Sequence, residues 1–150
     1  MLRPYTKSFL KNTFNSADNI CEILNIQKKT LGIYISFFHI FIITKMYYEL
    51  YFTDPYTNNL FIYWYYFLQG VILSNIIMNG CILVKLERHL FKDKKYLGPH
   101  NIIIYPFLRL FGITDYDTIK IIQVRFAMIT FIYALYVSHL KYTYYISNGS

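Results

Sequence analysis

The chain has 150 residues, of which 55% are hydrophobic and 21% aromatic, whereas only 15% are charged. This composition is too apolar for an ordinary soluble domain and indicates a membrane protein. The net charge of +7 comes from Lys and Arg residues in blocks beside apolar segments, which argues against nucleic acid and predicts anionic lipid headgroups as the charged partner.

The first thirty residues predict a short amphipathic helix. Asn15 or Ser16 is a possible helix cap, and Ile20, Ile23 and Leu24 follow on one side of the helix. We expect this helix to lead into the first membrane span.

The same region resembles a mitochondrial presequence. Arg3, Lys7 and Lys11 occur among hydroxyl residues, and no acidic residue precedes Asp18. We expect this segment to be retained in the chain. The pattern favours a mitochondrial protein; the alternative is a plain basic N-terminus of a bacterial or endomembrane protein.

Three apolar segments, at about 31–48, 60–84 and 124–140, predict transmembrane helices. The first contains Lys45, whose long side chain can reach the headgroups. Its length of about 18 residues corresponds to roughly 27 Å at 1.5 Å per residue, close to the thickness of a bilayer core. The second contains no charged residue, and the third has aromatic residues at both ends.

A fourth apolar segment, at about 101–111, is too short to cross a membrane. It contains Pro106 and Arg109, and we expect it to lie in the interface or to pack on a partner. The sequence therefore predicts an all-α integral membrane protein that forms a single domain over residues 1–150. It has three transmembrane helices, an N-terminal amphipathic helix and this short interfacial segment.

The basic residues of the connecting segments predict the orientation. Most lie in the N-terminal segment and in the second loop, 85–123, so both are expected on the matrix side, with the C-terminus opposite. The cations that directly follow the second span are expected to bind anionic headgroups, cardiolipin if the membrane is mitochondrial. These residues are Lys85, Arg88, Lys92, Lys94 and Lys95.

Small residues at helical spacing predict helix-packing faces within the spans. Close approach of backbones is what lets helices associate in lipid. In the second span Gly70 and Ser74 form one such face, which Cys81 continues. The third span carries a longer stripe of Ala127, Thr130, Ala134 and Ser138.

The histidines are the best candidates for chemistry. His39 lies within the first span and His139 at the far end of the third, at depths that differ by roughly 10 Å at 1.5 Å per residue, so one haem would not bridge them. We expect His39 to be buried, neutral and hydrogen-bonded, or to contact another subunit. Two cysteines, Cys21 and Cys81, are too few for a disulfide framework or a thiolate cluster. No phosphate loop, zinc-protease motif or nucleophile elbow occurs, so we expect no catalytic group, metal or cofactor.

The run RHLFKD at residues 88–93 resembles the R-H-x-x-x-D element that follows the second span in the cytochrome b membrane-anchor subunit of succinate dehydrogenases. The length, span count and orientation are also similar to that family. The family's S-x-x-H-R motif in the first span is matched by Ser36 and His39, with Ile40 in place of the arginine, and its haem histidine falls on Ile82. The resemblance implies a divergent anchor without the usual haem ligand, in which Arg88, His89 and Asp93 lie near a quinone pocket.

Three functions are consistent with these features. The first is a non-catalytic accessory subunit of a multi-subunit energy-transducing complex, a respiratory complex or the ATP synthase, in the mitochondrial inner membrane. Its partners would be the other membrane subunits of the complex and anionic lipids such as cardiolipin. The second is the divergent anchor subunit, to which haem or quinone would bind. The third, a small transporter, is disfavoured because the spans lack paired charges and internal symmetry.

Overall fold

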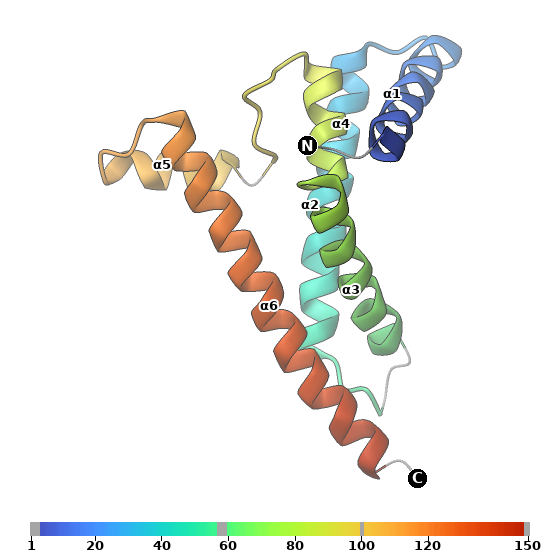
Figure 1. Cartoon of the computed structure of the whole chain (residues 1–150), viewed down its shortest axis with the longest axis vertical. Coiled ribbons are helices and arrows are strands. Elements are labelled where there is room, and N and C mark those ends of the chain that lie inside the picture. Colours follow the sequence, from blue (N-terminus) through green and yellow to red (C-terminus); the bar gives the residue numbers. More distant parts are fainter. Residues whose placement is uncertain (1–3, 57–59, 100, 149–150) are drawn as a thin grey trace. The chain divides into compact units, whose positions relative to one another are not determined.

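The computed structural model describes residues 4–56, 60–99 and 101–148, with side chains for all of these except residues 101–103 and 148. Over these ranges the chain is all-helical, as the sequence predicts, and contains no strand (Figure 1). Arg3 of the basic N-terminal segment lies outside the described residues. The helices are α1 (Pro4–Ile23), α2 (Lys28–Phe52), α3 (Leu60–Met78), α4 (Ile82–Phe91), α5 (Asn101–Leu110) and α6 (Tyr116–Asn148).

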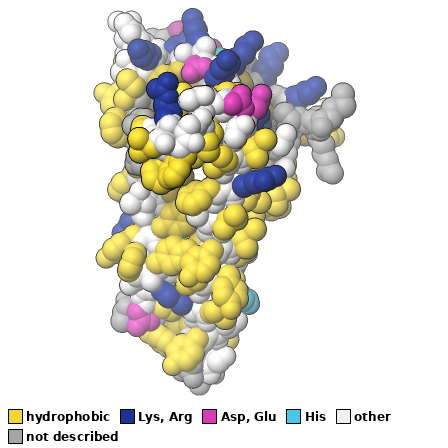
Figure 2. Space-filling view, turned by 90° about the vertical axis from the view of Figure 1, so that its left-hand side faces the viewer, with side chains coloured by type: hydrophobic (Ala, Val, Ile, Leu, Met, Phe, Trp, Pro, Cys, Tyr) yellow, Lys and Arg dark blue, Asp and Glu magenta, His cyan; other side chains and the backbone are white. Residues whose placement is uncertain are grey.

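Three of these helices, α2, α3 and α6, are long and apolar enough to cross a membrane. In the most apolar part of each, only 17% of the residues are buried inside the chain. Figure 2 shows hydrophobic side chains over long stretches of one face, with several Lys and Arg side chains gathered in one region. Each candidate span therefore presents most of its apolar surface to its surroundings.

The second expected span, 60–84, differs from the structure, because α3 ends at Met78. Asn79 adopts a left-handed conformation with φ of 53°. The N–H of Gly80 then donates to the carbonyl of Asn75, and that of Asn79 to the carbonyl of Ile76. These two hydrogen bonds form a Schellman motif, which ends a helix by satisfying its last carbonyl groups. Residues after the turn belong to the separate helix α4.

Other helix boundaries also differ from the expected ones. α1 begins at Pro4, a residue suited to a first helical turn, so Asn15 and Ser16 lie inside the helix and do not cap it. α6 begins eight residues before the expected third span because Asp115 caps it. The Asp115 carboxylate accepts hydrogen bonds from the backbone N–H and the hydroxyl of Thr118, at 2.9 and 2.8 Å. The expected interfacial segment is the helix α5, which contains Pro106.

The contacts divide the chain into two compact units. Unit 1 comprises Met1–Ile40 and Ser74–Pro106, and unit 2 comprises Phe41–Leu73 and Phe107–Ser150. Unit 1 has 10 Lys and Arg residues against 4 Asp and Glu, a net charge of +6, whereas unit 2 has 5 against 4, a net charge of +1. Nearly all of the net positive charge therefore belongs to unit 1.

The core of unit 1 joins α1 to α4. Ala17 and Cys21 of α1 pack against Leu90 of α4, and each of the three is at most 5% exposed. At Gly32 of α2, an added Cβ would lie 2.8 Å from a ring carbon of Phe91, so this glycine permits close contact with α4. These contacts hold α4 beside both α1 and the first half of α2.

The core of unit 2 joins α2, α3 and α6. Met46 and Leu50 of α2 pack with Phe61 and Leu68 of α3 and with Ala134 of α6. Ala134 is fully buried, as is Ser138 one turn later. The small residues of α6 therefore lie against the chain's own helices.

Candidate functional sites

The basic segment after α3 is not uniformly exposed. The Lys85 ammonium donates to the Met78 carbonyl, and Nε of Arg88 donates to the Tyr96 carbonyl. Both cations therefore satisfy backbone carbonyl groups, and the carbonyl that Lys85 meets is the last one of α3. Burial, together with the nearby charge of Arg88, lowers the pKa of Lys85 below its ordinary value.

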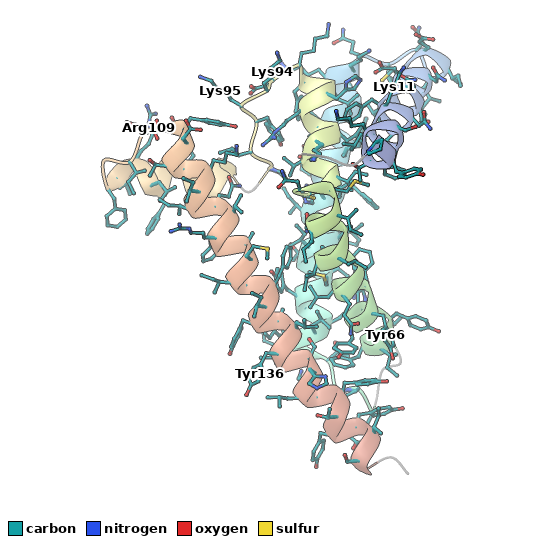
Figure 3. All side chains as sticks on the ribbon, viewed as in Figure 1. Lys11, Tyr66, Lys94, Lys95, Arg109 and Tyr136 are labelled. Atoms are coloured by element: carbon teal, nitrogen blue, oxygen red, sulfur yellow. The ribbon has the colours of Figure 1, made fainter. Side chains whose placement is uncertain are left out.

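In the same segment the side chains of Lys92, Lys94 and Lys95 are exposed. Lys92 ends α4 in a left-handed conformation, and the Asp93 carboxylate accepts the backbone N–H of Lys95. Figure 3 shows the side chains of Lys94 and Lys95 extending outward from the segment that follows α4. The lipid contact expected of Lys85 and Arg88 stays a prediction, and in the structure both cations make internal hydrogen bonds.

His89, a residue of the family resemblance, faces α1. Its Nε2 lies 2.9 Å from the carboxylate of Asp18, and its ring stacks on Phe14 at 4.6 Å between centroids. Lys28 lies 2.8 Å from the same Asp18 oxygen. The hydrogen bond from Lys28 lowers the pKa of Asp18, with burial opposing it and His89 adding to it. These contacts bind α1 to α4 and to the start of α2.

A buried polar cluster lies where α2 meets α4. His39 is 3% exposed and Glu87 is completely buried, and Nδ1 of His39 lies 3.2 Å from Oε1 of Glu87. On the other side of the ring, Nε2 lies 3.6 Å from Sγ of Cys81. One turn before His39, the Ser36 hydroxyl lies 3.2 Å from the Tyr96 hydroxyl. The structure confirms that His39 is buried and hydrogen-bonded, whereas its neutral form and a contact with another subunit stay predictions.

The second carboxyl oxygen of Glu87 is buried and has no hydrogen-bond partner within the described residues. An unsatisfied buried acceptor is costly, so the cluster retains capacity for one more donor. Among the described residues, no group of three His, Cys, Asp or Glu side chains has the arrangement of a metal site.

The two histidines considered for haem lie in different units and have different partners. Nδ1 of His139 lies 3.0 Å from the Tyr65 hydroxyl, and both residues line a shallow crevice of about 480 Å³ with Gln69 and Tyr136. This crevice is mostly apolar and lies between α3 and α6. A second hollow, of about 500 Å³, lies beside Lys141 at the end of α2.

The two small-residue stripes have different surroundings. In α6, Ala134 and Ser138 are fully buried, and the Thr130 hydroxyl accepts a hydrogen bond from Tyr47 of α2 at 3.1 Å. Ala127, at the start of the stripe, is partly buried. In α3, Gly70 is exposed with open space where a Cβ would stand, and Ser74 is partly buried. Cys81 does not continue the face formed by Gly70 and Ser74, because it lies beyond the end of α3.

Comparison with protein-family models, with curated proteins and with solved structures finds no match for this chain. Sequence reasoning singled out His39 and Arg88 but not Glu87 or Tyr96, because a glutamate and a tyrosine near a span boundary carry no distinctive pattern. Only the fold brings these residues to His39 and Ser36.

Proposed function

We propose that this chain is a non-catalytic accessory subunit of a multi-subunit energy-transducing complex in the mitochondrial inner membrane. In this role it packs its helices on neighbouring subunits and binds anionic lipid. The presequence-like composition of residues 1–17 supports the organelle. The concentration of Lys and Arg in the N-terminal segment and in residues 85–123 supports an orientation with both on the matrix side.

The observation that carries the proposal concerns two tyrosines near the middle of α6. Tyr133 and Tyr136 are 59% and 60% exposed, and within residues 4–56, 60–99 and 101–148 neither hydroxyl makes a hydrogen bond. A hydroxyl in the hydrocarbon region is costly unless another polar group satisfies it. A neighbouring subunit that covers this face of α6 would supply that group. Figure 3 shows the Tyr136 side chain on α6.

The proposal is tested by removing only these hydroxyl groups. The double variant Tyr133→Phe/Tyr136→Phe keeps the rings, and loses interhelical hydrogen bonds worth about 0.6 kcal/mol each on average. We expect the fraction of chain in the native assembly to fall about threefold for each lost bond. The matched control is Phe126→Leu, which changes another exposed aromatic of the same helix. Equal incorporation of the wild type and the double variant would contradict a partner at this face.

The orientation is tested by labelling single cysteines from each side of the membrane. Lys94→Cys and Ser147→Cys both replace exposed residues, and the native cysteines are changed to serine in both variants. The charge distribution predicts labelling from opposite sides. Labelling of both positions from one side would contradict three spans.

A second candidate function is the divergent anchor subunit of succinate dehydrogenase. One observation favours it: the two segments that carry the resemblance lie together in unit 1. The Ser36 hydroxyl contacts the Tyr96 hydroxyl, while Arg88 donates to the Tyr96 carbonyl. Asp93 lies in the turn between them. A quinone would need donors of this kind at the membrane boundary.

The two functions differ in what Arg88→Gln and Asp93→Asn change in the purified assembly. The anchor subunit predicts lost quinone reduction with unchanged bound lipid. The accessory subunit predicts unchanged quinone reduction, because neither side chain would touch the substrate. Lost turnover with normal lipid content would therefore decide against the accessory role.

A further inference from the structure

Three side chains in unit 1 form an ordered series that the proposed function does not use. Sγ of Cys81 lies 3.6 Å from Nε2 of His39, and Nδ1 of the same ring lies 3.2 Å from Oε1 of Glu87. When Nδ1 carries the ring proton and donates it to the carboxylate, Nε2 becomes an acceptor that faces the thiol. A base positioned against a nucleophile and oriented by a third group is the arrangement that activates cysteine.

Burial distinguishes the members of this series. Glu87 is completely buried and His39 is 3% exposed, so the pair that orients and accepts the proton is sheltered from water. Cys81 is only partly buried, unlike these two residues. Cys21, the other thiol of the chain, is buried in the core between α1 and α4 and has no such partner among the described residues.

The backbone also favours the thiolate form of Cys81. The residue is the N-cap of the ten-residue helix α4, where the helix dipole stabilises negative charge. Burial raises the pKa of the thiol, but two effects outweigh it: the positive charge that His39 gains when it takes the proton, and the backbone N–H groups of Val84 and Leu83. The pKa therefore lies below its ordinary value of 9.0.

We propose that Cys81 is a nucleophilic thiol, activated by His39, that accepts a long-chain acyl group from an acyl thioester. Nε2 of His39 takes the thiol proton, and Sγ attacks the thioester carbonyl carbon. The bond from that carbon to the carrier sulfur breaks as the new S–C bond forms. The carrier leaves as a thiol with the proton from His39, so no oxidant or reductant is needed. Glu87 is a positioning residue that holds the imidazole ring.

The location of Cys81 indicates why the acceptor would take a long acyl chain. α3, a candidate membrane span, ends at Met78, and Cys81 follows directly after the turn. Ile76 and Ile77, in the last turn of α3, are 64% and 53% exposed. An acyl chain on Cys81 can lie along these residues, and each methylene that enters lipid favours attachment. This inference requires that α3 enters a membrane but does not depend on any partner subunit.

Acylation is tested on membranes that contain the full chain, with palmitoyl-CoA as the probe. We expect one hydroxylamine-labile palmitoyl group per chain, located at Cys81 by mass spectrometry. Cys21→Ser should leave this modification unchanged, whereas Cys81→Ser should abolish it. Modification of Cys21 at an equal rate, or no modification at Cys81, would overturn the proposal.

The role of His39 in activating the Cys81 thiol is tested separately from the transfer of the acyl group. His39→Gln should slow palmitoylation of Cys81 at neutral pH by about 100-fold, which is the lower end of the range by which general bases accelerate reactions. A second measurement needs no substitution at the site: iodoacetamide should alkylate Cys81 faster in the folded chain than in the denatured chain. An unchanged rate in His39→Gln, or slower alkylation in the folded wild type, would show that the thiol is not activated.

Discussion

The ammonium group of Lys141 on α6 lies 2.7 Å from the carbonyl oxygen of Tyr51 on α2. It also donates to the carbonyls of Leu50 and Thr53, at 3.1 and 3.3 Å. These carbonyls belong to the C-terminal end of α2, where no further helical turn can satisfy them. A cation from α6 therefore caps α2, which is favourable for both charge and hydrogen bonding.

Replacing Lys141 with Met should destabilise unit 2. The change keeps an apolar stem of similar length but removes all three hydrogen bonds, and we expect a loss of about 2 kcal/mol in the free energy of unfolding. Titration of the reconstituted chain with SDS measures this quantity. Lys141→Arg is the matched control, since it keeps the charge and the donors. A loss of less than about 0.5 kcal/mol in Lys141→Met would mean that water satisfies the end of α2 equally well.

Ala134→Leu should disrupt the core in which α6 meets α2 and α3. Ala134 is fully buried against Met46, Leu50 and Phe61, so a larger side chain has no space there. Overpacking of this kind costs about 1–3 kcal/mol. The same SDS titration of Ile132→Leu, at a position that is 59% exposed, supplies the control. If the two variants unfold alike, the small-residue stripe does not pack inside the chain.

Acid should loosen α1 from the start of α2 and from α4 through Asp18. Because the hydrogen bond from Lys28 lowers the pKa of Asp18 below its usual 3.8, the folded state holds this proton less tightly than the unfolded state. The stabilisation is therefore present above pH 3.8 and is lost as the pH falls through the lower folded pKa. The loss is measured by hydrogen exchange of the α1 amides, corrected for the intrinsic effect of pH on exchange. In Asp18→Asn the acid-dependent step should disappear, and its persistence would assign the step to another group.

The exposed cations after α4 should retain anionic lipid. The triple variant Lys92→Gln/Lys94→Gln/Lys95→Gln removes three charges, each worth about 1 kcal/mol near an anionic surface. We expect less cardiolipin to copurify with the assembly, as measured by lipid mass spectrometry. Lys7→Gln/Lys11→Gln/Lys29→Gln, which removes three exposed cations elsewhere in the chain, controls for total charge. Equal cardiolipin in the triple variant and the wild type would place the lipid site elsewhere.

The sequence predicted the helical class because long apolar segments have few alternatives to a helix in a membrane. The end of α3 could also be predicted, since Asn79-Gly80 is a pair that suits a left-handed helix end. The absence of charged residues up to Val84 nevertheless favoured a longer span. The contact of His39 with Glu87 spans 48 residues of sequence and depends on how α2 packs against α4. Local patterns contain no information on such a pairing. Likewise, a lone Lys141 at the end of a span resembles a headgroup anchor until the fold shows which carbonyls it meets.

The native mass of the particle that contains this chain tests the accessory-subunit proposal most directly. The chain itself has a mass of 18.1 kDa. Mass spectrometry of mitochondrial inner membranes, solubilised gently and purified through a tag on this chain, should give a particle of several different membrane subunits in fixed ratio with bound cardiolipin. A particle that contains only this chain, as a monomer or as identical copies, would contradict the proposal.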